Sequence, residues 1–244
     1  MAGKNIKAYF NFNTNIQEKI VVKMAISSVS TEGAKKNLQA EMPHWDFDRV
    51  VANSQEKWNR ELSKVSIEAN SKADEETFYT ALYHSMLSPT LYEDVDGNYR
   101  GLDQNVYSST GFTNYTTFSL WDTYRALHPL FNFLQPKRNN DMVKSMIAHQ
   151  EQSVHKMLPI WSHYGNENWC MIGYHAVSVL SDAVTKGTTD ADIHKILNAC
   201  ISTSNVDYFD GIGYYKKLGY VPEDKSGNSV SKTLEYAYND WCIA

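Results

Sequence analysis

The stretch Phe118-Ser119-Leu120-Trp121-Asp122-Thr123-Tyr124-Arg125 is the most informative part of the chain, and it opens a helical run towards Pro136. The Trp121 ring offers a broad stacking face, and the Asp122 carboxylate beside it offers two acceptors that can bridge neighbouring hydroxyls. Arg125 follows Asp122 closely enough for both to share a helix face and form an ion pair. The set suits a sugar subsite. From spacing alone, an ordinary helical turn with a buried Trp and an Asp–Arg salt bridge is the simpler interpretation.

Helical periodicity continues on both sides of this stretch. Asp74 is the expected N-cap of a helix that has its apolar positions on one face and ends at Pro89. Asp190 is the expected N-cap of a later helix, and Gly187 closes the helix before it. Successive helical hairpins can close into an α/α toroid, although a plain helical bundle has the same local pattern. The expected helices cover residues 31–62, 74–88, 119–135, about 140–154, about 171–186, 190–201 and 229–244.

The first part of the chain predicts β-strands instead. Apolar and polar residues alternate over residues 6–12 and again over 20–26, which is the period of half-buried strands. Two strands alone are only marginally stable in water, so these two are expected to belong to a larger sheet. Asp96-Gly97 between strand-like runs predicts a hairpin, which Tyr99–Asp103 would close.

Composition excludes several classes of protein. The 244 residues carry 23 basic and 28 acidic side chains, a net charge of −5, and no basic run, which argues against nucleic acid as a partner. No apolar run reaches the roughly 18 residues of a membrane span, and no signal peptide is visible. Three cysteines are too few and odd in number for a disulfide framework. Phosphate-binding, nucleophile-elbow and zinc-protease motifs are absent from the sequence.

A second candidate segment runs from Gly165 to His175. It gathers amides, a carboxylate, two aromatic rings and an imidazole around an expected loop-to-helix junction, a place that can host a ligand. Glu167 can serve as a general acid or a cation ligand, or it can cap the helix start. His175 lacks a second His or Cys at ligand spacing, so it is a weak metal candidate. Near the end of the chain, Glu235 and Asp240 are either functional acids or part of a charged helix face.

Together these segments resemble glycoside hydrolase family 92. The similarity runs in order along essentially the whole chain, and the motifs are specific as a set rather than singly. The segments that carry the resemblance are Glu32–Leu38, Pro43–Asp48, Phe78–His84, Asp96–Gly101, Thr117–Pro129, Gly165–Glu167, Cys170–Ala176, Gly219–Pro222 and Ser231–Ala244.

The resemblance implies a calcium-dependent, exo-acting α-mannosidase that inverts configuration and trims mannose from N-glycans and related mannans. It implies a mainly α fold: a partial (α/α)6 toroid preceded by two strands of a truncated β-sandwich and by linker helices. Residues 1–30 are then the C-terminal strands of the sandwich domain, 31–70 the linker helices, and 71–244 the first part of the catalytic domain. The full-length protein is expected to be periplasmic or secreted.

The resemblance also separates site residues that this chain holds from those it lacks. Trp121 and Asp122 look like the mannose-subsite pair, and Glu167, Asn168 and His175 are further substrate-binding candidates. The catalytic acid and base of the family belong to Glu-Gly-Asn-Ala-Trp-Gln-type and Gly-Gly-Asn-Asp-type motifs, which do not occur here. They and the Ca2+ ligands are expected beyond Ala244, so the isolated chain is expected to be inactive.

Two other functions remain open at this point. One is a non-catalytic carbohydrate-binding or interaction module that kept the Trp121–Asp122 surface. The other is a different (α/α)6 glycosidase, such as a glucosidase or trehalase relative. The expected partners are mannose-containing oligosaccharides and the remainder of the same polypeptide.

Overall fold

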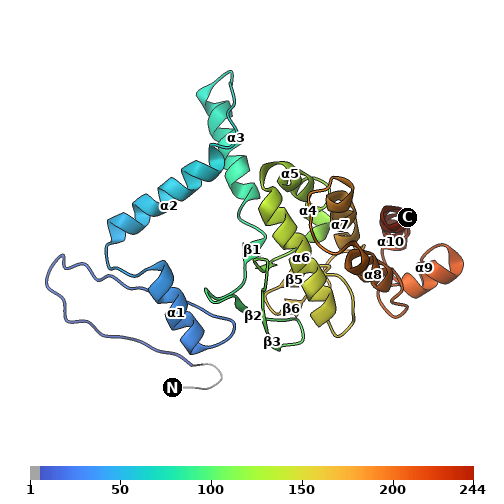
Figure 1. Cartoon of the computed structure of the whole chain (residues 1–244), viewed down its shortest axis with the longest axis horizontal. Helices are drawn as coiled ribbons and strands as arrows, with labels where there is room; N and C mark the ends of the chain where they lie inside the picture. Colours follow the sequence, from blue (N-terminus) through green and yellow to red (C-terminus); the bar gives the residue numbers. More distant parts are fainter. Residues whose placement is uncertain (1–5) are drawn as a thin grey trace.

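An apolar core shared by helical hairpins organises the chain after residue 117 (Figure 1). The computed structural model describes residues 6–244. Phe118, Met146 and Leu180 are among the largest side chains that are fully buried in this core. The mainly helical class predicted from the sequence is confirmed. The helices around the core are α4 (Leu120–Thr123), α5 (Leu127–Leu134), α6 (Pro136–Gln152), α7 (Ala176–Thr185), α8 (Ile193–Ser204), α9 (Ile212–Leu218) and α10 (Ser229–Ile243).

Helix α7 lies at the centre of this group. It contacts α5, α6, α8 and α10. Its sequence is apolar on almost every side, and a helix of that kind is stable only when other elements surround it. The buried residues of α7 are Ala176, Val177, Ser178, Val179, Leu180 and Ala183.

A directional chain of hydrogen bonds, two buried and one partly buried, ties α5, α6 and α7 together. The Asp182 carboxylate accepts from Nδ2 of Asn132 at 2.8 Å. Oδ1 of Asn132 accepts from Nδ2 of Asn139 at 2.7 Å. Oδ1 of Asn139 is therefore left to accept from His128, whose Nδ1 lies 3.0 Å away. Because an ionised carboxylate only accepts, it sets the orientation of both amides and places the His128 proton on Nδ1.

Helix starts differ from the sequence prediction by two or three residues. Ser71, rather than Asp74, caps α3 (Lys72–Ser85), and its hydroxyl accepts the Asp74 N–H at 3.2 Å. Asp192, rather than Asp190, caps α8 and accepts the His194 N–H at 2.8 Å. The Asp190 carboxylate is instead 2.7 Å from Nζ of Lys144 on α6. In both cases the residue chosen from sequence was an acid close to the true cap.

Two expected helices are shorter than predicted. The run from residue 119 breaks between α4 and α5, where Arg125 folds back and donates from Nη2 to the Trp121 carbonyl at 3.1 Å. Helix α7 begins at Ala176 instead of about residue 171, because Met171 and Gly173 have positive φ values of 68° and 79°. A left-handed backbone conformation cannot continue a right-handed helix.

The short strands form three antiparallel pairs. β1 (Thr90–Leu91) pairs with β4 (Tyr115–Thr116), and β5 (Ser162–His163) with β6 (Asn166–Glu167). β2 (Asn98–Arg100) pairs with β3 (Val106–Ser108), so the predicted hairpin exists. Its turn is formed by residues 101–105, where Asp103 accepts the Asn105 N–H at 3.0 Å. The predicted turn at Asp96-Gly97 also exists: the Gly97 N–H donates to the Asp94 carbonyl at 2.8 Å, and Gly97 has a φ of 80°. This turn precedes β2 and faces helix α1 through the Lys36–Asp96 ion pair, so it does not connect the two strands of the hairpin.

The expected N-terminal strands are also absent from the structure. Residues 6–30 form no strand, and the first five residues of the predicted 1–30 segment lie outside the described residues. Phe10, Met24 and Ile26 are 77–81% exposed. The alternation can produce a strand only beside another strand, because the backbone N–H and C=O groups need ladder partners. No such neighbour lies alongside within residues 6–244. Helices α1 (Thr31–Glu41) and α2 (Phe47–Leu62) do form in the predicted linker, while the domain boundaries themselves stay a prediction.

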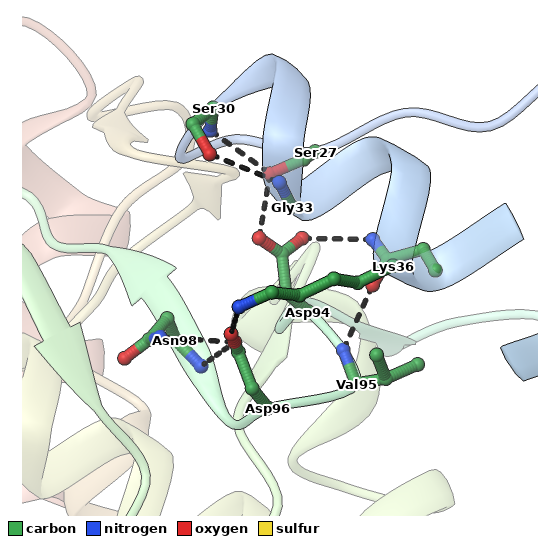
Figure 2. A network of polar contacts seen from close by, with 9 residues as sticks. Ser27, Ser30, Gly33, Lys36, Asp94, Val95, Asp96 and Asn98 are labelled. Atoms are coloured by element: carbon green, nitrogen blue, oxygen red, sulfur yellow. Dashed lines mark hydrogen bonds and ion pairs between the residues drawn. The ribbon is translucent and has the colours of Figure 1, made fainter. Parts of the chain in front are cut away.

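A buried carboxylate attaches α1 to the rest of the chain (Figure 2). Asp94 is only 5% exposed. Its Oδ2 accepts from the Ser27 hydroxyl at 2.6 Å, and its Oδ1 accepts from Nδ2 of Asn37 at 2.8 Å. Oδ1 of Asn37 in turn accepts the Val95 N–H at 2.8 Å. Gly33 packs directly over this carboxylate, and a Cβ there would overlap it.

The first prediction concerns Gly33. In Gly33→Ala, helix propensity gains about 1 kcal/mol, but overlap with the Asp94 carboxylate costs about 1–3 kcal/mol and breaks its hydrogen bonds. We expect a net loss of unfolding free energy, measured by urea denaturation. Gly227→Ala is the matched control, since a Cβ there meets nothing and φ is not in the left-handed range. Equal stability of the two variants would contradict the packing described for Asp94.

The second prediction concerns pH. Burial lowers the pKa of both His128 and His149 from 6.5 to about 4. Between pH 4 and 6.5 the unfolded chain binds protons that the folded chain does not. The free energy of unfolding is therefore highest near pH 7 and falls as the pH is lowered. Each imidazole contributes roughly 1.4 kcal/mol per pH unit to this slope. Urea denaturation at pH 7 and 5 measures it. His128→Gln should flatten the slope and His194→Gln, at an exposed site, should not. A pH-independent stability over this range is inconsistent with two buried neutral imidazoles.

Candidate functional site

A cavity of about 620 Å³ lies where the segments before α7 and α10 meet α4. Its volume is within the range of roughly 300–1,000 Å³ typical of small-molecule sites. One side is aromatic and the other polar, with both an acid and a base. The lining residues are Trp121 from α4; Trp169, Met171 and Ile172 from the segment before α7; Phe209 and Asp210 from the segment before α9; and Asn228, Ser231 and Lys232 at the start of α10.

Trp121 borders this cavity, and Asp122 lies beside it. The Arg125 guanidinium is 4.7 Å from the centre of the Trp121 ring, a cation–π contact. The expected Asp122–Arg125 ion pair is absent from the described residues, and the Asp122 carboxylate is exposed without a polar partner among them. The indole Nε1 of Trp121 is buried and finds no acceptor within residues 6–244. Because Asp122 and Arg125 do not pair, the alternative of a helical turn held by an Asp–Arg salt bridge is wrong.

Glu167 acts as an acceptor for backbone amides. Its Oε1 accepts the N–H groups of Trp161 at 2.7 Å and Trp169 at 3.0 Å, and its Oε2 accepts that of Ile160 at 3.0 Å. Burial raises the pKa of this carboxyl, and the amide hydrogen bonds partly offset the rise. Glu167 does not line the cavity. Because its carboxylate accepts three backbone amides, it fixes the conformation of the loop before α7. Asn168 is exposed and also lies outside the cavity lining.

His175 belongs to a cluster at the start of α7. The Tyr174 N–H donates to Oδ1 of Asn239 at 2.8 Å, so Nδ2 of Asn239 faces Nδ1 of His175 at 3.1 Å. The His175 proton therefore sits on Nε2, 2.7 Å from Oε2 of Glu235, at an angle that departs from an ideal hydrogen bond. The Tyr124 ring stacks on the imidazole with centroids 4.1 Å apart. Burial, with the positive charge of Arg125, lowers the pKa of His175 to about 4.

A partly buried ion pair forms part of the polar side of the cavity. Lys232 is 5% exposed, and its Nζ lies 2.5 Å from Oδ1 of Asp210 and 2.8 Å from Oγ of Ser226. The Tyr236 hydroxyl donates to the Asp210 carbonyl at 2.8 Å. Sequence reasoning missed Asp210 because residues 202–228 carry no periodic pattern, and it missed Lys232 because a single lysine in a helix normally faces solvent.

The structure brings together only part of the predicted site. Trp121 lines the cavity, whereas Asp122, Glu167, Asn168 and His175 do not. Trp169 and Phe209 were missed as cavity residues, and the only signal for Trp169 was its place beside Glu167. Within residues 6–244, no three His, Cys, Asp or Glu side chains gather in a way that could hold a metal ion. None of the helices in that range is long and apolar enough to cross a membrane.

Aromatic faces lie opposite hydrogen-bonding side chains in this cavity, and these are the two kinds of surface that a sugar ring with its hydroxyls would require. Comparison with known proteins identifies the family. Residues 33–244 match the model of the glycosyl hydrolase family 92 catalytic domain. The chain belongs to this family.

Solved structures support the assignment. The chain is 51% identical to a family 92 α-mannosidase from Bacteroides thetaiotaomicron, with a TM-score of 0.86 over 89% of this chain and 29% of that one. A family 92 inverting mannosidase from the same organism is 35% identical, with a TM-score of 0.82 over 89% of this chain and 30% of that one. An uncharacterized secreted glycosidase of Arthroderma benhamiae is 24% identical, over 96% of this chain and 28% of its own length. The chain thus spans less than a third of these relatives.

The third prediction concerns Glu167. In Glu167→Gln one oxygen becomes an NH2 group that faces a backbone N–H instead of accepting from it. Leaving a buried donor unsatisfied costs about 1–3 kcal/mol, so we expect that loss of unfolding free energy in urea denaturation. Glu75→Gln, at an exposed position in the first turn of α3, is the control and should change stability by less than about 0.5 kcal/mol. A Glu167 variant as stable as the control would refute the amide-binding role.

Proposed function

We propose that the full-length protein containing this chain is an exo-acting α-mannosidase that removes α-linked mannose from N-glycans or mannans. The observation that carries the proposal is the 51% identity, at a TM-score of 0.86, to a family 92 α-mannosidase. The match covers 89% of this chain, which includes most of its helices. The secreted relative supports export of the protein, to the periplasm or outside the cell.

The proposed reaction is a direct displacement with inversion, as the name of the 35% identical relative suggests. In this mechanism a carboxylic acid protonates the leaving oxygen while a carboxylate activates water on the opposite face, the two standing roughly 6.5–9.5 Å apart. We place both groups, and the ligands of a calcium ion, outside this chain. No three His, Cys, Asp or Glu side chains within residues 6–244 gather around a possible metal position, so no ligand of calcium is assigned among them.

This chain would contribute the mannose subsite. Trp121 would stack on the apolar face of the sugar ring, and the exposed Asp122 carboxylate, which has no protein partner among the described residues, would accept hydrogen bonds from its hydroxyls. The Arg125 guanidinium holds the Trp121 ring in place through the contact of 4.7 Å. The toroid of which these helices form part would close with helices outside the chain.

The fourth prediction tests the function and the role of Asp122. The full-length protein should release mannose from α-mannobiose, with β-mannose as the first anomer seen by NMR. Asp122→Asn should lower kcat/KM about 10- to 100-fold, since a hydrogen bond to a charged group contributes about 1.5–3 kcal/mol. Glu75→Gln again serves as the control and should have no effect.

Three outcomes would contradict this set of proposals. Absence of mannose release by the full-length protein would refute the α-mannosidase proposal, and binding of mannose without hydrolysis would favour a carbohydrate-binding module. Full activity of Asp122→Asn would remove this residue from the subsite. Release of mannose by residues 1–244 alone would show that the acid and base lie within this chain.

A further inference from the structure

The cavity extends past Trp121 to a second indole, that of Trp169, and to the Lys232–Asp210 pair. We propose that Trp169, Asp210 and Lys232 form a binding position for the leaving-group sugar of the substrate, next to the mannose position at Trp121. The proposal rests on the α-mannosidase function and adds which part of the substrate this cavity recognises. Its ligand is a neutral pyranose joined to the terminal mannose.

The loop before α7 places Trp169 on the cavity in a constrained way. Trp169 has a positive φ of 55°, a conformation that bulky side chains rarely adopt. Its N–H donates to the buried Glu167 carboxylate at 3.0 Å, which keeps the backbone in this conformation. The indole packs against the Phe209 ring at a centroid distance of 4.9 Å and against His155 at 5.2 Å. Both contacts hold a flat apolar surface at the cavity wall.

The polar side of the cavity matches the hydroxyls of a sugar. An ammonium group has three donors, and Lys232 uses two of them, on Asp210 and Ser226. Asp210 likewise keeps acceptor capacity, since its Oδ2 has only a distant contact of 3.5 Å with the Tyr236 hydroxyl. Taking an ion pair out of water costs desolvation free energy. A purely apolar ligand would form no hydrogen bonds with such a pair, so its presence favours a ligand with polar groups. The two opposite charges cancel, which favours a neutral polyol over an anionic ligand.

The position of Asp122 separates the two sugar positions. Trp121 lines the cavity while Asp122, the neighbouring acceptor, does not. A mannose held by Trp121 and Asp122 would therefore occupy the border of the cavity, on the α4 side. The remaining volume, between the Trp169 ring and the start of α10, is then available to the next unit of the oligosaccharide.

The test uses the full-length protein and two substrates that share the mannose but differ in the leaving group. In Trp169→Ala, we expect kcat/KM for α-mannobiose to fall at least about tenfold, equivalent to ~1.4 kcal/mol, and that for methyl α-mannoside to stay within about twofold. Trp169→Phe keeps an aromatic face and should recover most of the activity on α-mannobiose. Trp169 is the chosen residue because removing Asp210 would leave the buried Lys232 ammonium without its charge partner, and removing Lys232 would leave the partly buried Asp210 carboxylate without one.

Each other result overturns the proposal in a recognisable way. An equal loss on both substrates would mean that Trp169 only supports the fold of the loop. Unchanged activity on α-mannobiose would mean that the leaving group does not contact this wall. A wild-type protein inactive on both mannosides would refute the proposed function itself, and this inference with it.

Discussion

The carboxylate of Asp182 sets the direction of the hydrogen-bond chain on which the arrangement of α5, α6 and α7 depends. It can only accept, so Asn132 must donate to it, Asn139 must donate to Asn132, and His128 must donate to Asn139. These side chains come from three helices, so the hydrogen bonds constrain how the helices are placed relative to one another. Apolar packing alone would tolerate small shifts of one helix along another. The hydrogen bonds between Asp182, Asn132, Asn139 and His128 would be broken by such shifts.

The same requirement for polar partners shapes the end of α7 that faces the cavity region. Because α7 is buried on almost every side, water cannot serve the backbone groups that precede it. Asn239 accepts the Tyr174 N–H, and Glu167 accepts three amides from the loop further upstream. Both groups lie behind the surface that would meet a ligand. The loop that carries Trp169 therefore has a fixed shape before any substrate arrives, which lowers the entropic cost of binding.

Much of the fold, and less of the site, followed from the sequence. Apolar periodicity located the helices, because that pattern directly records which face is buried. Capping preference failed at Asp74 and Asp190, where a nearby Ser or Asp of equal capping ability is the one used. Periodicity failed for residues 6–26, since alternation indicates a strand only when a second strand is present. Trp121 could be found because an aromatic ring next to an acid is informative by itself. The roles of Glu167 and Lys232 could not. The amides that reach Glu167 are set by the irregular backbone of its own loop, and the acid that pairs with Lys232 lies 22 residues away.

The seclusion of His128 has a spectroscopic consequence. Its Nδ1 proton lies in a fully buried hydrogen bond to Asn139, so it meets water only when α5 and α6 separate. Such a proton exchanges slowly and would give a resolved downfield resonance in water. Its exchange rate would report the opening of the helical core directly, without a label, and independently of events at the cavity.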